Sequence, residues 1–297
     1  GYPGPFAAAV TSSSASLAII IPPSIPMIVY AVMAQSSVVQ LFVAGVVPGI
    51  IGGFLMMFAA YIYARRKNLP IEENFNLVNL RKTAKEAALA FLLPIIILGG
   101  IFGGVVTATE GAGLAVVAAL IIGLIYREFD FKRLYQAATE GAIQTAAVML
   151  LVAASVLLGE FLTVEQIPQK VAESIIDMTQ NKYAVLAILN VFLLVIGFFL
   201  HSVAAIILTV PIVMPLVNAV GIDPVHFGII VTLNLAIGQQ TPPVASVLVT
   251  ACSVAKADIW DVTRANIMFI CVLLFLLMLV TYVPAVPMTL VEFFYRS

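Results

Sequence analysis

The sequence predicts an all-α, multi-span membrane protein that contains two inverted repeats, and three observations lead to this fold class. Hydrophobic residues make up 62% of the 297 residues and charged residues only 10%, too few polar side chains to cover a water-soluble domain. Apolar runs long enough to cross about 30 Å of hydrocarbon recur along the chain. The segment between Gly1 and Pro23 returns, in weakened form, between Gly221 and Pro243.

Both copies of this repeat contain a helix that is interrupted by a proline pair. In each copy a Gly-Pro turn leads into phenylalanine and a run of small, apolar and hydroxylated residues, which ends at Pro22-Pro23 or Pro242-Pro243. Proline has no N–H donor, so carbonyls in the preceding turn lose their helical partners and can face a cation such as Na⁺. Two matched interrupted spans indicate the binding site of a secondary transporter. The alternative is a pair of proline kinks between packed helices.

The apolar runs and the charged stretches give an ordered map of the chain. The expected elements are a broken helix (6–34), a span (41–64), an amphipathic surface stretch (68–86), two shorter apolar runs (89–105 and 111–125), a span (142–162), an interfacial helix (164–180), a hairpin (184–200 and 203–220), a second broken helix (227–254) and a last span (267–283).

Most of the 14 basic residues fall into three connections between these elements. The positive-inside rule places the three connections in the cytoplasm. The first broken helix then runs outward, the hairpin enters from outside, and the second broken helix runs inward, so the repeats have inverted topology. The basic residues concerned are Arg65, Arg66, Lys67, Arg81, Lys82 and Lys85; Arg127, Lys132 and Arg133; and Lys256 and Arg264.

Other features of the sequence argue against several classes of protein. The net charge of -1 gives no reason to expect nucleic-acid binding, and the two cysteines lie in apolar stretches that form no disulfide or metal pattern. A membrane-embedded enzyme needs converging acid, base or nucleophile side chains, and no such set stands out. Among acidic residues near apolar runs, Glu110 is equally compatible with a functional role and with a role at the start of a helix after Thr107.

Several motifs, in order along the whole chain, resemble the large membrane subunit of TRAP transporters, the tripartite ATP-independent periplasmic carriers. These motifs are Phe6-Ala-Ala-Ala-Val-Thr11, Ile20-Ile-Pro-Pro-Ser-Ile-Pro26, Phe42-Val-Ala-Gly-Val-Val-Pro48, Thr107-Ala-Thr-Glu110, Gly221-Ile-Asp-Pro-Val-His-Phe227 and Asn234-Leu-Ala-Ile-Gly-Gln-Gln-Thr-Pro-Pro243. Family members usually carry helices and a re-entrant hairpin before the first of these motifs. The chain is therefore expected to be the later part of a longer polypeptide, or to work with a separate chain.

The resemblance implies a sodium-coupled, elevator-type importer in the bacterial inner membrane. Its substrate would be an organic acid, delivered by a periplasmic substrate-binding protein, and a small membrane subunit would complete it within the lipid bilayer. The run from Gln239 to Ala245 favours sialic acid over a C4-dicarboxylate. The alternative is a sodium/carboxylate symporter of related fold that needs no binding protein.

The elevator architecture implies a division into moving and stationary parts. The transport domain would comprise 1–37 and 182–264, the scaffold 38–88 and 137–181, with 89–136 in either part and 265–297 as the C-terminal membrane helix. The basic stretch 68–86 would lie on the cytoplasmic membrane surface and brace the scaffold.

The family's sodium sites carry over to backbone oxygens at each proline pair. Ala18, Ile21 and Pro23 would hold a first Na⁺, although the family commonly has glycine where Ala18 stands. Gly238, Thr241 and Pro243 would hold a second Na⁺, with Ser202 at the hairpin tip. Ser14 is a further candidate ligand.

The substrate-binding candidates are His201, Ser202 and Gln240. As a structural residue His201 would cap a half-helix or bond a neighbouring carbonyl. As a functional one it would touch an anionic substrate or respond to protons. A structural or substrate-facing role is favoured over proton coupling.

Overall fold

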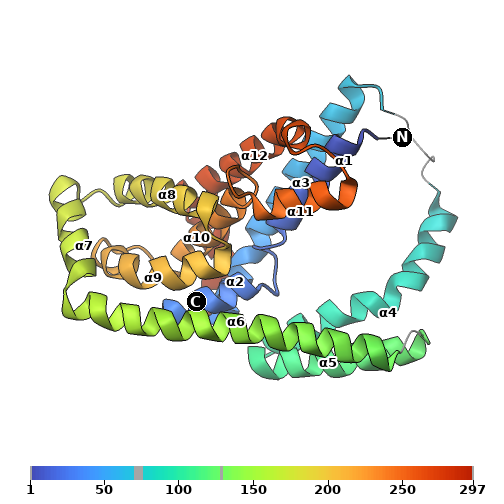
Figure 1. The fold of residues 1–297 in the computed structure, drawn as a ribbon, viewed down its shortest axis with the longest axis horizontal. Helices are drawn as coiled ribbons and strands as arrows, with labels where there is room; N and C mark the ends of the chain where they lie inside the picture. Colours follow the sequence, from blue (N-terminus) through green and yellow to red (C-terminus); the bar gives the residue numbers. More distant parts are fainter. Residues whose placement is uncertain (1, 70–75, 128–129, 296–297) are drawn as a thin grey trace. The chain divides into compact units, whose positions relative to one another are not determined.

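Every regular element in the described part of the chain is a helix (Figure 1). The computed structural model describes residues 2–69, 76–127 and 130–295, apart from the side chains of Glu86, Ala90 and Thr163. Within these residues six helices are long and apolar enough to cross a membrane, or up to seven if one bent pair is counted as a span. The predicted all-α, multi-span fold is therefore confirmed.

The helices follow one another without intervening strands in the described ranges. They are α1 (Gly4–Leu17), α2 (Ile25–Met33), α3 (Val38–Arg66), α4 (Leu77–Phe102), α5 (Ala108–Ile125), α6 (Phe131–Val164), α7 (Ile167–Met178), α8 (Lys182–Phe199), α9 (Ser202–Ala219), α10 (Pro224–Gly238), α11 (Ser246–Ala255), α12 (Ile259–Tyr282) and α13 (Ala285–Tyr295).

Both broken helices and the hairpin form where the sequence predicts them. The first broken helix is α1 followed by α2, and the second is α10 followed by α11, each with its proline pair in the gap. The hairpin consists of α8 and α9, which meet at Leu200 and His201. Each of α1 and α10 has a proline in its first turn. Proline is tolerated there, because the N–H at that position would have no helical partner.

Three details of the map differ from the prediction. Helix α4 extends from the basic stretch into the apolar run, and its axis turns by 53° between Lys85 and Ala87. Helix α6 begins at Phe131, well before the apolar core of its span. Helix α13 follows Pro284 as a further apolar helix. Residues 70–75 of the predicted surface stretch 68–86 lie outside the described residues.

Most of the basic residues that the sequence analysis assigns to connections lie within helices, and those of the predicted amphipathic stretch 68–86 lie in α4. Arg65 and Arg66 form the last turn of α3, where cations complement the helix dipole. Arg81, Lys82 and Lys85 lie in α4, and Lys132 and Arg133 in α6. Charged residues continue a helix readily once it has left the apolar layer, because lysine and arginine have good helix propensity.

The chain divides into two compact units. Unit 1 comprises Gly1–Leu69 and Leu151–Ser297, and unit 2 comprises Pro70–Leu150. In unit 2, α4 packs against α5, and only 6% of the α5 span is buried. Such an exposed apolar surface is typical of helices that face lipid or another membrane chain.

Helix α10 is the core of unit 1. Every residue from Val225 to Gly238 is buried, and the helix packs against α8, α12, α3 and α9. A helix that is apolar and enclosed on all sides can sit only inside a bundle. The second proline break therefore begins at the end of the most buried helix in the unit.

A chain of buried polar side chains joins α10 to its neighbours. The Asn234 amide donates to Asn190 Oδ1 of α8 at 2.6 Å, and the Asn190 amide donates to Thr281 Oγ1 of α12 at 3.1 Å. His226 Nε2 lies 2.8 Å from the carbonyl oxygen of Val280 and, as the partner of a carbonyl, donates to it. Because unpaired polar groups are costly in an apolar interior, these contacts fix the register of α8, α10 and α12.

Glu110 forms a capping box at the start of α5. Its carboxylate accepts hydrogen bonds from the Thr107 backbone N–H at 2.8 Å and the Thr107 hydroxyl at 2.9 Å. The Thr107 hydroxyl accepts from the Glu110 N–H at 3.3 Å. This geometry accounts for Glu110 as a structural residue.

Candidate functional site

The two proline breaks share one hydrogen-bonding pattern. In the first, the N–H of Ile20 donates to Leu17 at 3.1 Å and that of Ile21 donates to Ala18 at 3.2 Å. In the second, Gln240 donates to Ile237 at 3.1 Å and Thr241 to Gly238 at 3.0 Å. Each helix thus tightens into an i to i−3 turn immediately before its proline pair, which is the usual way in which a helix end satisfies its last donors.

The carbonyls released by the prolines find local partners in both breaks. In an unbroken helix the carbonyls of Ile19 and Gln239 would pair with the second proline of each pair. Instead, the Ser24 hydroxyl donates to Ile19, and the N–H of Val247 donates to Gln239 at 3.2 Å. These contacts close each break into a compact loop, and a carbonyl that accepts one bond keeps a second lone pair.

A glycine from a neighbouring helix lies directly against each break. A Cβ added at Gly45 of α3 would lie 2.3 Å from the carbonyl oxygen of Ile20. At the second break the neighbouring glycine is Gly197 of α8, which lies against Gly238 at the end of α10. A Cβ added at Gly238 would lie 2.4 Å from the carbonyl carbon of Gly197. Only glycine allows this approach, so the covering helices α3 and α8 are held against the breaks backbone to backbone.

The residues expected to hold the first Na⁺ lie on an exposed face of unit 1. Ala18, Ile21 and Pro23 are all exposed, while Pro22 between them is buried. Ser14 is also exposed, and its hydroxyl donates to the Val10 carbonyl of its own helix at 2.8 Å. The structure places these four positions on one broken helix, α1 with its following loop.

The residues expected to hold the second Na⁺ are more enclosed. Gly238 and Ser202 are buried, Thr241 is half-buried, and Pro243 is exposed. The Thr241 hydroxyl donates its proton to the Ile237 carbonyl at 3.1 Å, which leaves its oxygen lone pairs free to accept a donor or a cation. These donors are neutral oxygens, and no group of three or more His, Cys, Asp or Glu that could hold a metal occurs among the described residues. Neutral oxygens suit a monovalent cation better than Ca²⁺, which prefers carboxylates.

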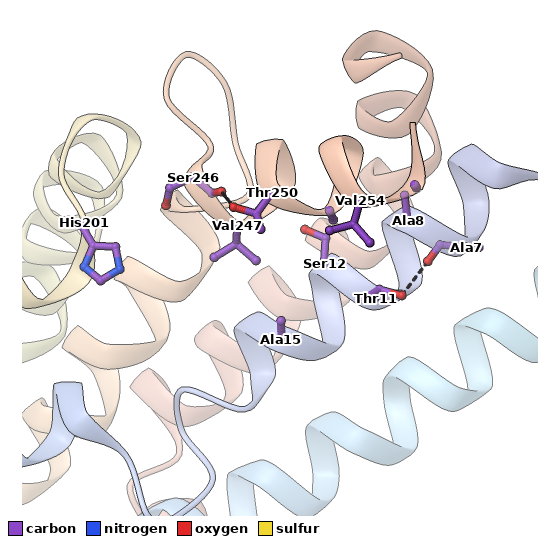
Figure 2. Close-up of a pocket in the computed structure, with 12 residues that line it drawn as sticks. Ala7, Ala8, Thr11, Ser12, Ala15, His201, Ser246, Val247, Thr250 and Val254 are labelled. Carbon is purple, nitrogen blue, oxygen red and sulfur yellow. Dashed lines mark hydrogen bonds between the residues drawn. The ribbon is translucent and has the colours of Figure 1, made fainter. Parts of the chain in front are cut away.

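A cavity of about 520 Å³ lies between the first half of one broken helix and the second half of the other (Figure 2). Helix α1 forms one wall and α11 the opposite wall, and His201 of the hairpin tip stands at one end. The walls carry alanines, valines and hydroxyl groups and no carboxylate. The lining residues are Ala7, Ala8, Thr11, Ser12, Ala15, His201, Ser246, Val247, Thr250, Ala251, Val254 and Ala255.

The polar groups of this cavity differ in how they are satisfied. Thr11 and Thr250 donate to carbonyls of their own helices, at 2.9 Å to Ala7 and 2.9 Å to Ser246. The Ser12 hydroxyl is fully buried and has no hydrogen-bond partner among the described residues. A buried hydroxyl without a partner costs free energy, and a ligand that bonded Ser12 would recover it.

The three substrate-binding candidates occupy different positions. His201 is exposed to the cavity, at the N-cap position of α9, and makes no side-chain cap hydrogen bond there. Ser202, the next residue, is buried. Gln240 does not line the cavity; it is fully buried, and its Oε1 accepts from Ser13 at 3.0 Å and from Asn266 at 2.8 Å.

Sequence reasoning did not single out Ser246, Thr250 or Asn266. The signal for the first two is their spacing of four residues on α11, which mirrors the spacing of Ala7, Thr11 and Ala15 on α1 and puts each set on one helix face. Asn266 carries no local signal, because its partners are distant in sequence.

The fold and the site together define a multi-pass membrane protein with paired broken helices around a mainly apolar cavity that carries a few hydroxyl groups. The family model described as "Tripartite ATP-independent periplasmic transporter, DctM component" matches residues 1–286. The chain belongs to this family of transporter permeases, and it is a multi-pass inner-membrane protein. The predicted family is thereby confirmed.

Curated relatives carry names with different substrates. The chain is 40% identical over 290 residues to an isethionate TRAP transporter permease protein of Oleidesulfovibrio alaskensis, covering 97% of this chain and 46% of the relative. It is 38% identical to a C4-dicarboxylate TRAP transporter large permease protein of Pseudomonas aeruginosa, over 98% of this chain and 68% of the relative. It is 33% identical to a sialic acid TRAP transporter large permease protein of Vibrio cholerae, over 99% of this chain and 69% of the relative.

Proposed function

We propose that the protein is the substrate-translocating part of a sodium-coupled importer of organic acids, which works by an elevator mechanism. The observation that carries the proposal is the cavity between α1 and α11, because each wall belongs to a helix interrupted by a matched proline pair. Binding sites of secondary transporters lie at such repeat interfaces. A cavity of about 520 Å³ lies within the usual range for small-molecule sites, roughly 300–1,000 Å³.

Sodium is the proposed co-substrate, bound by neutral oxygens at each break. The second break supports this role best, because Thr241 has its proton committed to Ile237 while Gly238 is enclosed by Gly197. The carbonyls of Ala18, Ile21 and Pro23 are the corresponding groups in the first break. Two ions bound beside the substrate cavity would make substrate affinity depend on the sodium concentration.

The proposed substrate is an organic acid that a periplasmic binding protein delivers, with a small membrane subunit completing the complex. The run from Gln239 to Ala245 favours sialic acid, whereas the relatives of 40% and 38% identity carry isethionate and C4-dicarboxylate in their names. The cavity offers His201 and hydroxyl donors to an anion, a donor set that several organic acids could use.

The test is uptake by the complete permease, with its small membrane subunit, reconstituted in proteoliposomes. Labelled N-acetylneuraminate, succinate and isethionate are compared with and without an inward sodium gradient, and with and without the binding protein. Uptake of one acid that requires both the gradient and the binding protein is the expected result. Sodium-driven uptake without the binding protein would favour the symporter alternative, and uptake indifferent to sodium would refute the coupling.

A further inference from the structure

The side chain of Gln240 belongs to a closed polar cluster that joins three elements. Ser13 Oγ of α1 lies 3.0 Å from Gln240 Oε1 and 2.6 Å from Asn266 Oδ1 of α12, and the Asn266 amide donates to Gln240 Oε1 at 2.8 Å. All three side chains are 0% exposed. The Ser13 hydroxyl has one proton, which can bond either Gln240 Oε1 or Asn266 Oδ1 but not both at once. The hydrogen bonds of the three side chains therefore depend on one another.

Two members of this cluster are sequence neighbours of residues at the cavity and at the second break. Ser13 follows Ser12, which lines the cavity, and Gln240 precedes Thr241, the proposed sodium ligand. One hydrogen bond between Ser13 and Gln240 therefore links the wall of the substrate cavity to the loop of the second break. Asn266 ties the same bond to α12, which packs against both α1 and α10.

The amide of Gln240 is only half satisfied in this environment. Its Nε2 is buried and has no hydrogen-bond partner among the described residues. A purely structural glutamine in a helical core is expected to satisfy both ends of its amide, because an unpaired buried donor is costly. The oxygen end of the amide is thus held by Ser13 and Asn266, while the nitrogen end has no partner among the described residues.

We propose that Gln240 is a positioning residue that couples sodium occupancy at the second break to substrate affinity in the cavity, by holding the loop that follows α10 against Ser13 of α1. The proposal rests on the proposed function, since it presupposes sodium-coupled transport. Gln240 acts through Ser13 and does not itself touch the substrate.

The test compares Gln240→Met with the matched control Gln239→Met. Methionine keeps the length of the side chain and removes the oxygen that accepts from Ser13 and Asn266. The neighbouring Gln239 is also buried, but its amide contacts the Leu235 carbonyl of its own helix, at 3.5 Å. Both variants are measured in the complete complex in proteoliposomes, with N-acetylneuraminate, succinate and isethionate as probes at several sodium concentrations.

In the unaltered complex, the KM of the transported acid should fall as sodium rises. Gln240→Met should flatten this dependence and raise the half-saturating sodium concentration about tenfold, a change worth about 1.4 kcal/mol. Gln239→Met should keep both values within about twofold, since its bond lies within one helix. Ser13→Ala is the milder variant: it should produce part of the effect, because it removes the bond from Ser13 to Gln240 and leaves the bond from Asn266 to Gln240 in place.

The possible outcomes separate the two hypotheses. If the unaltered complex shows no sodium dependence, the proposed function fails, and with it the basis of the coupling. If the unaltered complex depends on sodium and both Gln240→Met and Ser13→Ala retain that dependence, the coupling role of Gln240 is refuted while the proposed function stands. Should Gln240→Met not assemble, Ser13→Ala alone decides, because loss of a single hydroxyl leaves the helix intact.

Discussion

At the scale of single residues, the helix breaks matter because of what they do to neighbouring oxygens. Thr241 illustrates the effect. Its hydroxyl donates to Ile237 at 3.1 Å, the usual way in which a threonine satisfies its proton inside a helix. Thr241 lies in the turn that follows α10, which ends at Gly238, and the next two residues are prolines, so its hydroxyl oxygen lies at an open end of the backbone.

The first prediction concerns this hydroxyl. Thr241→Val keeps the shape of the side chain but removes one neutral oxygen, a loss of about 1–3 kcal/mol. At about 1.4 kcal/mol per tenfold, the half-saturating sodium concentration for uptake should rise by one to two orders of magnitude. Ser14→Ala should have a smaller effect, because that exposed hydroxyl already bonds Val10.

The matched control for this variant is Thr209→Val in α9. The Thr209 hydroxyl is buried and donates to the carbonyl four residues before it, at 2.7 Å, as Thr241 does, but Thr209 is not next to either proline pair in the sequence. Its loss should leave the sodium dependence unchanged. If the two valine variants behave alike, the second break does not bind sodium through Thr241, and the paired breaks act as kinks.

At the scale of helices, close packing of glycine holds the breaks in place. Helix α3 contains Gly45, where an added Cβ would lie 2.3 Å from the Ile20 carbonyl oxygen, and Gly53, where it would meet nothing within 4 Å. The same helix therefore provides both a test position and its control.

Gly45→Ala should destabilise the purified permease in detergent, by about 1–3 kcal/mol, because backbone atoms of the first break must move to admit the methyl group. Gly53→Ala should leave stability unchanged or raise it by up to about 1 kcal/mol, since alanine favours helix over glycine. Fluorescence-detected size-exclusion chromatography after heating measures both. A melting temperature for Gly45→Ala equal to that of Gly53→Ala would show that α3 does not pack tightly on the break.

The helices also show how far sequence reasoning reaches. The broken helices and the hairpin tip at His201 could be predicted, because prolines, apolar runs and an internal repeat are local signals. The start of α6 and the extension of α4 from the basic stretch into the apolar run could not, because polar residues beyond the apolar layer remain helical without changing the hydropathy pattern. Helix α13 could not be predicted either, because Pro284 and Pro287 interrupt the apolar pattern after the last predicted span.

The candidate site divides in the same way. The proline breaks follow from the sequence, and His201 was recognised by its place between two apolar runs. The bond between Ser13 and Gln240 and the contact of Gly197 with Gly238 join residues far apart in the chain, so no local pattern reveals them. Tertiary packing alone decides that Gln240 faces α12 and not the cavity.

At the scale of the whole molecule, the inverted topology is the property on which the transport proposal depends. If the two broken helices run in opposite directions, as predicted, each side of the membrane would have an equivalent route to the cavity between α1 and α11. The predicted direction of each span rests on the positive-inside rule and on the order of the spans. A test of two positions, one near each predicted surface, therefore tests the arrangement of the entire chain.

The last prediction concerns the membrane side of Lys82 and Gln180. Lys82 lies in the basic part of α4, predicted to be cytoplasmic, and Gln180 lies between α7 and α8, where the hairpin is predicted to enter from outside; both are exposed. Exposed Cys271 and buried Cys252 are first replaced by serine, which removes background labelling. A membrane-impermeant maleimide should then label Gln180→Cys in intact cells and Lys82→Cys only in inside-out vesicles. The reverse pattern would invert the whole predicted topology. If the broken helices run in opposite directions, an odd number of membrane crossings must separate the two positions. Labelling of both positions from one side would therefore refute the inverted repeat.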